Sequence, residues 1–192
     1  MLILFTAACG PTEPQSGDTS DTTDDSGGGS SSNCASVTVP EVVINEFLAS
    51  NDTVNADTAG DYDDWIEVYN YGSTIVQYDG LYLTDDKETP TKWAFPAGDG
   101  LAAGDYFLVF ADGEYDTEGS DHTSFKLEKK GEYVGIWYAE GGSTCSVDAI
   151  NFKGQAADIS SSRIPDGSMT WEQTTPTPGA ANQSGVDTGA VE

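Results

Sequence analysis

The feature that most restricts the fold of this chain is a series of short apolar or alternating runs, separated by clusters of Gly, Asp, Asn and Pro. The series extends from residue 37 to residue 182. No stretch within it keeps the helical period of about 3.6 residues with good helix formers. Runs of this kind are typical of β-strands bounded by turns. We therefore expect an all-β domain with strands at residues 42–49, 65–70, 81–85, 92–95, 106–111, 124–127, 133–139, 145–152 and 161–164.

The spacing of these segments predicts a fold class. Seven to nine short strands, each bounded by turn residues, suit an immunoglobulin-like β-sandwich with Greek-key connections. A small closed barrel is the alternative that the same spacing allows. We expect the domain to occupy residues 35–183.

The first residues carry a processing pattern. Residues 1–8 are mainly apolar and end in small side chains directly before Cys9-Gly10. This pattern resembles a bacterial lipoprotein signal, in which cleavage before the cysteine is followed by its acylation. The run is too short for a transmembrane helix, which needs about 20 apolar residues. We expect a signal peptide at residues 1–8 whose true start lies upstream, lipidation of Cys9, and outer-membrane sorting from Gly10. The alternative is an unmodified cysteine.

Two segments flank the predicted domain. Residues 9–34 consist mostly of Gly, Ser, Thr, Asp and Pro, and residues 184–192 have a similar composition. Segments with so few apolar side chains cannot bury a core and are expected to be disordered. As a flexible coil, the first segment would span about 27 Å r.m.s.. We therefore interpret residues 9–34 as a disordered acidic tether and residues 184–192 as a flexible tail.

The charge of the chain restricts its partners. The sequence has 33 acidic and 7 basic residues, a formal net charge of −26, and its first basic residue is Lys87. Such a chain repels the phosphates of nucleic acids and anionic lipid headgroups. We expect no nucleic acid partner, and membrane attachment through the lipid anchor only. Because acidic edges also discourage strand pairing between copies, we expect a monomer.

The two remaining cysteines form an even pair. Cys34 precedes the first predicted strand and Cys145 lies in a later one. In an exported chain such a pair favours a disulfide, which would contribute on the order of 4 kcal/mol by closing a long loop. Two free thiols are the alternative.

Many short blocks occur in a recognisable order. They begin with the strand 43–51, an acidic loop and the segment 64–70, and they close with Thr177-Pro178-Gly179-Ala180-Ala181-Asn182. In these blocks the chain resembles the lamin tail domain family, in its secreted bacterial form. The matching positions are Asn45, Glu46, Trp65, Glu67, Asn70, Gly80, Pro96, Phe125, Gly131, Pro178, Gly179 and Asn182.

The resemblance implies an immunoglobulin-like fold and a binding or tethering role. In nuclear lamins the domain binds proteins and chromatin, but this sequence shows no coiled-coil rod, so that role is not implied. Our leading hypothesis is a non-enzymatic, lipid-anchored, extracytoplasmic interaction module, whose partner is a protein or a surface glycan. Because fold alone does not determine function, each candidate site needs its own evidence.

Catalysis and zinc binding have little support in the sequence. The single histidine, His122, has Asp121 and Ser124 nearby, which suggests a hydrolytic triad. No nucleophile-elbow sequence accompanies them, so we interpret His122 as a structural, hydrogen-bonding residue and the chain as a non-enzyme. One histidine and no close cysteine pair also argue against zinc.

Calcium is the metal that the sequence favours. Five candidate ligands are carboxylates of two acidic loops, and the last of them begins a second cluster of acids, which follows the strand ending at Ala111. Carboxylate oxygens suit calcium, although the spacing is not that of an EF-hand. The alternative function is therefore a calcium-dependent carbohydrate-binding or adhesion module, and the opposing interpretation is that these acids are solvated turn residues. The candidates are Asp57, Asp61, Asp63, Asp64 and Asp112; the second cluster comprises Asp112, Glu114, Asp116, Glu118 and Asp121. No other cofactor is expected.

Two acids and one aromatic strand have structural interpretations. Glu46 and Glu67 lie inside apolar strands, so we expect them to be buried and hydrogen-bonded to the backbone or to Asn45 and Asn70. Residues 133–138 are apolar or aromatic on both faces. We favour a core strand over a platform for sugar stacking.

Overall fold

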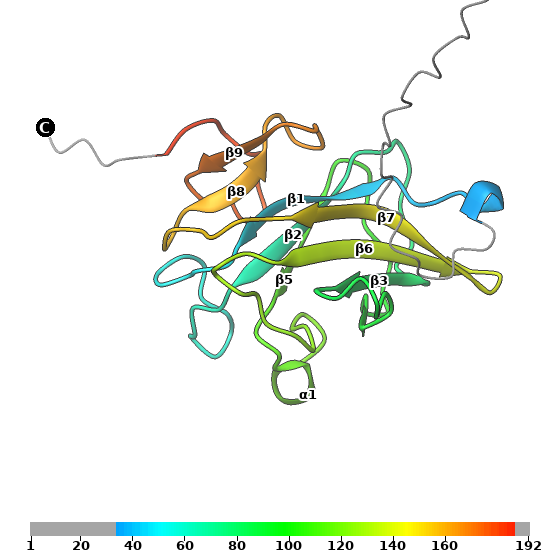
Figure 1. Cartoon of the computed structure of the whole chain (residues 1–192), viewed down its shortest axis with the longest axis horizontal. Coiled ribbons are helices and arrows are strands. Elements are labelled where there is room, and N and C mark those ends of the chain that lie inside the picture. The colour runs from blue at the N-terminus through cyan, green and yellow to red at the C-terminus, as the bar shows by residue number, and fades with distance from the viewer. Residues whose placement is uncertain (1–33, 187–192) are drawn as a thin grey trace, which may run out of the picture.

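The computed structural model describes residues 34–186, which form two packed antiparallel sheets (Figure 1). The strands are β1 (Val42–Leu48), β2 (Trp65–Asn70), β3 (Leu81–Thr84), β4 (Trp93–Ala94), β5 (Tyr106–Phe110), β6 (Tyr133–Glu140), β7 (Ser143–Asn151), β8 (Ser160–Arg163) and β9 (Trp171–Thr174). One sheet has the order β5-β2-β1-β8-β9 and the other the order β4-β3-β6-β7. The predicted immunoglobulin-like sandwich is confirmed, and the two separate sheets exclude the closed barrel.

A β-bulge in β1 decides which of its side chains enter the core. The register against β2 shifts between Ile44 and Glu46, so Asn45 is an extra residue in the ladder. Val42 and Ile44 therefore face the core before the bulge, and Phe47 faces it afterwards. Because the bulge changes the phase of the alternation, Glu46 points to the opposite face of the sheet.

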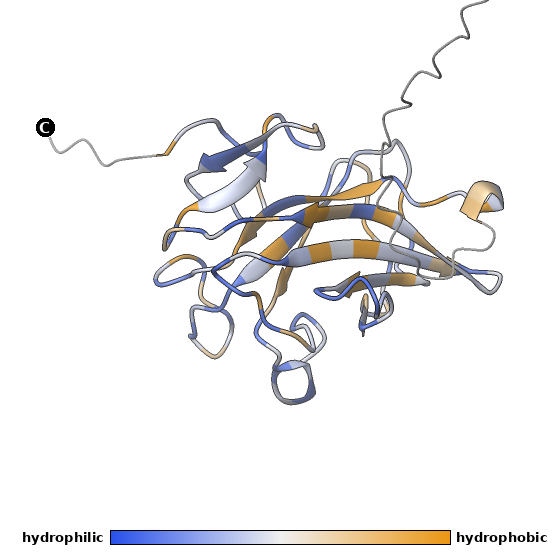
Figure 2. Cartoon of the chain, in the orientation of Figure 1, coloured by the Kyte–Doolittle hydropathy of each residue, from blue (hydrophilic) through white to orange (hydrophobic). Residues whose placement is uncertain are grey.

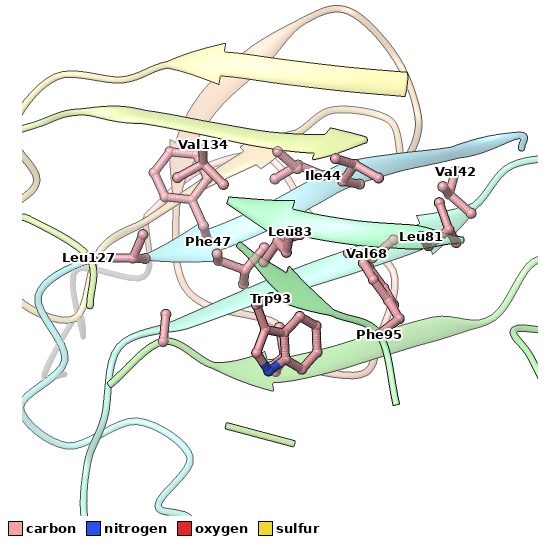
Figure 3. Packing of buried hydrophobic residues seen from close by; sticks show 14 of the residues in the cluster. Val42, Ile44, Phe47, Val68, Leu81, Leu83, Trp93, Phe95, Leu127 and Val134 are labelled. Carbon is pink, nitrogen blue, oxygen red and sulfur yellow. The ribbon is translucent and has the colours of Figure 1, made fainter. Parts of the chain in front are cut away.

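The core lies between the two sheets. Alternate apolar residues of β6 and β7 appear as orange bands in Figure 2, in keeping with one buried face on each strand. Figure 3 shows the side chains of both sheets meeting around Phe47 and Leu83. Burial of large apolar and aromatic side chains is the main stabilising contribution here. The largest buried members include Ile44, Phe47, Ile66, Leu81, Leu83, Trp93, Phe95 and Ile136.

Several predictions of local structure were wrong. The predicted strand 124–127 has only an isolated bridge, between Lys126 and Asp112. β9 was missed, since its polar sequence lacks an apolar alternation and it pairs only at the sheet edge with β8. No helix was predicted, but the turn α1 (Tyr115–Glu118) follows β5, and a short 3-10 turn spans Cys34–Ser36.

Two cross-links join distant segments of the sandwich. A disulfide connects Cys34 with Cys145 of β7 across 111 residues. Arg163 of β8 donates from Nε to the carbonyl oxygen of Ile44 at 2.7 Å and from Nη2 to the Asp148 carboxylate at 2.9 Å. Because Ile44 and Asp148 belong to different sheets, this guanidinium holds the two layers together.

The predicted flanking features lie largely outside the described residues. These include the signal peptide, Cys9 and nearly all of the tether at residues 9–34. At the other end, Thr175 N–H donates to the Gly185 carbonyl at 3.1 Å, so ordered contacts extend past residue 183. Within residues 34–186, no helix is long and apolar enough to cross a membrane.

Candidate functional site

Acidic loops converge at one end of the sandwich. The loop after β1 carries Asp57, and the segment after β5 carries Asp112, Glu118 on α1, and His122. Ligand-type atoms of Asp57, Glu118 and His122 all lie within 4.8 Å of one another, and atoms of Asp112, Glu114 and Glu118 form a second such group. We call Asp57, Asp112, Glu118 and His122 the rim cluster. Figure 1 shows α1 projecting from the sheets at this end.

Asp57 holds its own loop through one carboxylate oxygen only. Oδ1 accepts the backbone N–H groups of Gly60 and Asp61, both at 2.8 Å. Asp side chains often stabilise loops by accepting hydrogen bonds from nearby backbone N–H groups in this way. The side chain is 0% exposed, and while Glu118 is ionised Oδ2 accepts no hydrogen bond from any described residue. A buried oxygen of this kind is unusual, because buried polar atoms are nearly always paired.

His122 is buried and oriented by Asp112. Its Nδ1 lies 2.5 Å from Oδ2 of Asp112, and its ring stacks on Phe110 with 5.1 Å between centroids. Its Nε2 faces Asp57 Oδ2 at 3.9 Å and Glu118 Oε2 at 3.7 Å. Burial acts to lower the pKa of His122, but the hydrogen bond to Asp112 and the surrounding acids raise it above its usual value.

Neighbouring carboxylates alter one another's ionisation at this rim. The nearness of Asp57 raises the pKa of Glu118 to about 7, because a proton on one carboxyl would be shared with the other. Burial raises the pKa of Asp64 to about 6. Asp63 has a raised pKa through burial and the charges of Asp112 and Asp57. These acids therefore concentrate negative charge at this end of the sandwich, and the raised pKa values mean that protonation removes part of that charge.

The structure places the five predicted calcium residues in different surroundings. Asp57 and Asp112 belong to the rim cluster. Asp61 is exposed, and Asp64 accepts the Asn51 N–H at 2.9 Å. Asp63, Asp64 and Asp112 together line a neighbouring hollow of about 230 Å³. No observation here favours calcium over another cation, so the calcium interpretation stays a prediction. The sequence interpretation did not join His122 to the first ligand group, because it considered this residue only for the triad.

The hydrolytic triad considered from the sequence is not formed. The Ser124 hydroxyl donates to the Lys92 carbonyl at 3.3 Å instead of contacting the imidazole. Asp112, not Asp121, holds His122. A triad is defined by such contacts and not by nearness in sequence.

A second polar cluster covers the outer face of the β5-β2-β1-β8-β9 sheet. Glu46 is completely buried and accepts hydroxyl hydrogen bonds from Ser160 at 2.5 Å, Ser162 at 3.0 Å and Thr177 at 2.9 Å. The Thr177 N–H donates to it as well. Burial raises the pKa of Glu46, although these donors oppose that effect.

Glu67 lies beside it in the same layer. Its oxygens accept from Asn45 Nδ2 at 3.3 Å and from the Gly179 N–H at 2.6 Å. Asp166 accepts from Asn45 and from the Asn182 N–H, both at 3.0 Å. The segment after β9 is therefore fastened onto β1 and β2 by buried carboxylates, and both glutamates have the partners expected of buried acids.

The other residues that match the family pattern have contacts or positions that indicate a structural role. Asn70 donates to the carbonyls of Thr74 and Leu101 instead of contacting a glutamate. A Cβ on Gly80, which has φ of 79°, would lie 2.6 Å from a backbone oxygen, so glycine is required there. Trp65 and Phe125 are buried. The remaining positions, Pro96, Gly131 and Pro178, lie in loops.

The aromatic strand β6 is mainly a core strand. Val134 and Ile136 are buried between the sheets, and Tyr138 packs against the same core. On its other face Trp137 Nε1 donates to the Tyr133 hydroxyl at 3.0 Å, and both rings are half-buried. These contacts favour core packing over a sugar-stacking platform.

The buried glutamates predict an unusual dependence of stability on pH. Burial raises the pKa of Glu67 from 4.5 to about 7, with smaller contributions from the charges of Glu46 and Asp166. The folded state then binds a proton more tightly than the unfolded state between these pH values. The stability that Glu67 contributes is therefore fully present below about pH 4.5 and is lost as pH rises through 7, by about 3 kcal/mol.

Urea unfolding between pH 4.5 and 7.5 measures this dependence. In Glu67→Gln the decline in unfolding free energy should be clearly smaller, because the titrating group is gone. Glu88→Gln, at an exposed loop position, is the matched control and should keep the wild-type slope. Equal slopes in all three proteins would contradict the prediction.

One family model matches most of the described domain. It is described as the Lamin Tail Domain and matches residues 35–161. No curated protein and no solved structure matches the chain. The match covers both sheets up to the beginning of β8, including Asn45, Glu46 and Glu67, and it also includes the rim cluster.

Proposed function

The chain belongs to the lamin tail domain family, and from this premise we propose that it is a lipid-anchored, extracytoplasmic interaction module that holds its sandwich near a membrane. The family is one of non-catalytic immunoglobulin-like domains, which supports an interaction module in general. The finer statements, namely the anchor at Cys9, the outer membrane and a protein or glycan partner, belong to the proposal.

The observation that carries this proposal is the disulfide between Cys34 and Cys145. Structural disulfides are typical of proteins that leave the reducing cytosol, which supports an extracytoplasmic location. Cys34 is also the first described residue of the domain. A force applied through the preceding segment would therefore reach β7 through a covalent bond before it reached any strand ladder. Such an attachment suits a domain held by its N-terminal side.

The acidic surface restricts what the module can contact. With a net charge of −26, the chain would be repelled by anionic headgroups, so the attachment is assigned to acylation of Cys9 and not to a protein surface. The same charge favours partners that are neutral or basic where they meet the domain.

Cell fractionation with a Cys9→Ser variant tests the proposal. We expect the wild-type chain to remain with the membrane fraction after a high-salt wash, since an acyl anchor is insensitive to ionic strength, and to incorporate a labelled fatty acid. Cys9→Ser should lose the label and move to the soluble extracytoplasmic fraction. A Ser16→Ala variant, altered in the same segment, should behave like the wild type. Unlabelled wild-type chain, or a Cys9→Ser chain still held at the membrane, would overturn the anchor.

A further inference from the structure

The rim cluster has the composition of a metal site rather than of an acidic turn. It combines one imidazole nitrogen with two carboxylates from separate loops, and these three ligand atoms lie within 4.8 Å of one another. The loop after β1 supplies Asp57, and α1 with the residues after it supplies Glu118 and His122. Sites assembled from separate segments in this way can link those segments when an ion is bound.

The distances from His122 Nε2 to the nearest oxygens of Asp57 and Glu118 are closer to those between ligands of one metal ion than to hydrogen-bond lengths. Nε2 lies 3.9 Å from Asp57 Oδ2 and 3.7 Å from Glu118 Oε2. Both separations are too long for hydrogen bonds. Two nitrogen or oxygen ligands of a tetrahedral zinc ion lie about 3.4 Å apart, since each is about 2.1 Å from the metal. Small rotations of the two carboxylates would reach that value.

Asp57 supplies an independent indication of a ligand. Its side chain is 0% exposed, and with both carboxyls of the Asp57–Glu118 pair ionised, its Oδ2 has no hydrogen-bond donor among the described residues. The other oxygen is already used by the turn at Gly60 and Asp61. A buried carboxylate oxygen without a donor is costly, and a cation in front of it would remove that cost.

Asp112 prepares the imidazole for metal binding. The 2.5 Å contact between Asp112 Oδ2 and His122 Nδ1 places the ring proton on Nδ1 when the imidazole is neutral. The lone pair of Nε2 then points toward Asp57 and Glu118. A carboxylate that orients a ligating histidine through its second nitrogen is a common feature of zinc sites.

From this arrangement we infer that Asp57 Oδ2, Glu118 Oε2 and His122 Nε2 bind a divalent transition-metal ion of the zinc class, with Asp112 positioning the histidine. A nitrogen donor distinguishes the site from those of calcium and magnesium, which take oxygen ligands. Three protein ligands leave a further coordination position for water or another ligand. The bound ion would link the loop after β1 to α1. The proposed metal site does not depend on the proposed membrane anchor.

Zinc titration of the full chain in a Cys9→Ser background tests the site, because that background removes the one thiol outside the disulfide. We expect metal-stripped protein to bind one equivalent of Zn²⁺ by calorimetry and to melt at a higher temperature with it. Glu118→Gln should weaken zinc binding about 10-fold or more. Asp116→Asn is the matched control, because it removes one carboxylate charge from the same turn at an exposed position. It should bind as the parent does.

Further measurements keep the inference open to contradiction. Asp57→Asn retains the Oδ1 acceptor of the turn and should weaken zinc binding comparably to Glu118→Gln. The visible absorption spectrum of Co²⁺ bound at the site should appear in the parent and in Asp116→Asn, and disappear in Glu118→Gln. The inference fails if Zn²⁺ does not bind, if Glu118→Gln binds it as well as Asp116→Asn, or if Ca²⁺ binds equally tightly. Near-ultraviolet circular dichroism establishes that each variant is folded.

Discussion

Replacing Cys34 and Cys145 by alanine should lower the free energy of unfolding by about 4 to 5 kcal/mol, the largest loss expected from a change that leaves the sheets intact. The disulfide closes a loop across 111 residues, so its removal greatly increases the entropy of the unfolded chain. For a domain of this size, the melting temperature should fall by roughly 10 to 20 °C. Urea unfolding in a Cys9→Ser background measures the effect without mixed disulfides.

Reduction provides the control for this prediction. Dithiothreitol should destabilise the parent protein to nearly the same extent as the double replacement, because both remove the same covalent link. The double variant itself should not respond to dithiothreitol. If reduction leaves the stability of the parent unchanged, the cross-link does not stabilise the domain.

Replacing Arg163 by methionine should cost about 3 to 5 kcal/mol. The guanidinium is nearly buried, with 7% of its side chain exposed, and it bonds Asp148 at 2.9 Å and the carbonyl of Ile44 at 2.7 Å. It also lies over the ring of Trp171, 4.6 Å from the centroid. Methionine keeps much of the volume but leaves the Asp148 charge and the Ile44 carbonyl without their main partner.

Two further variants separate charge from packing in this prediction. Arg163→Met combined with Asp148→Asn should be more stable than Arg163→Met alone, because no unpaired carboxylate remains, while the introduced amide oxygen can still accept the Ile44 N–H. Lys126→Met removes a cation from an exposed pair, with Glu114 at 4.0 Å, and should cost less than about 1 kcal/mol. Chemical denaturation of the four proteins gives the comparison. Similar losses for Arg163→Met and Lys126→Met would refute the role assigned to Arg163.

The sequence identified only some of the residues that the structure brings together as potential metal ligands in the rim cluster. Asp57 and Asp112 were recognised as candidate ligands because carboxylates crowd those loops. His122 was not joined to them, since it is 65 residues beyond Asp57 and its nearest acid in sequence is Asp121. The fold instead turns the imidazole toward Asp112, Asp57 and Glu118. Sequence spacing carries no information about such side-chain directions.

For the buried glutamates, the sequence predicted burial and the presence of hydrogen-bond partners, but not which residues donate to Glu46. Glu46 and Glu67 could be expected to be buried with partners, because acids inside apolar strands are too costly otherwise. The expected contact of Asn45 with Glu67 is present. The hydroxyls around Glu46, however, come from β8 and from Thr177, more than a hundred residues away. No local pattern marks Ser160 or Ser162 as its donors.

Local alternation and turn chemistry were enough to predict an all-β sandwich and most of its strands, because period-two burial is written into neighbouring residues. They failed for β9, whose polar sequence lacks an apolar alternation although it pairs with the preceding strand β8, and for residues 124–127, which form only an isolated bridge to Asp112. The Asn45 bulge, the placement of Arg163 across two sheets and the meeting of two loops at His122 were decided only by the tertiary structure. Each depends on contacts between residues remote in the chain, whose free energy exists only once the layers have packed.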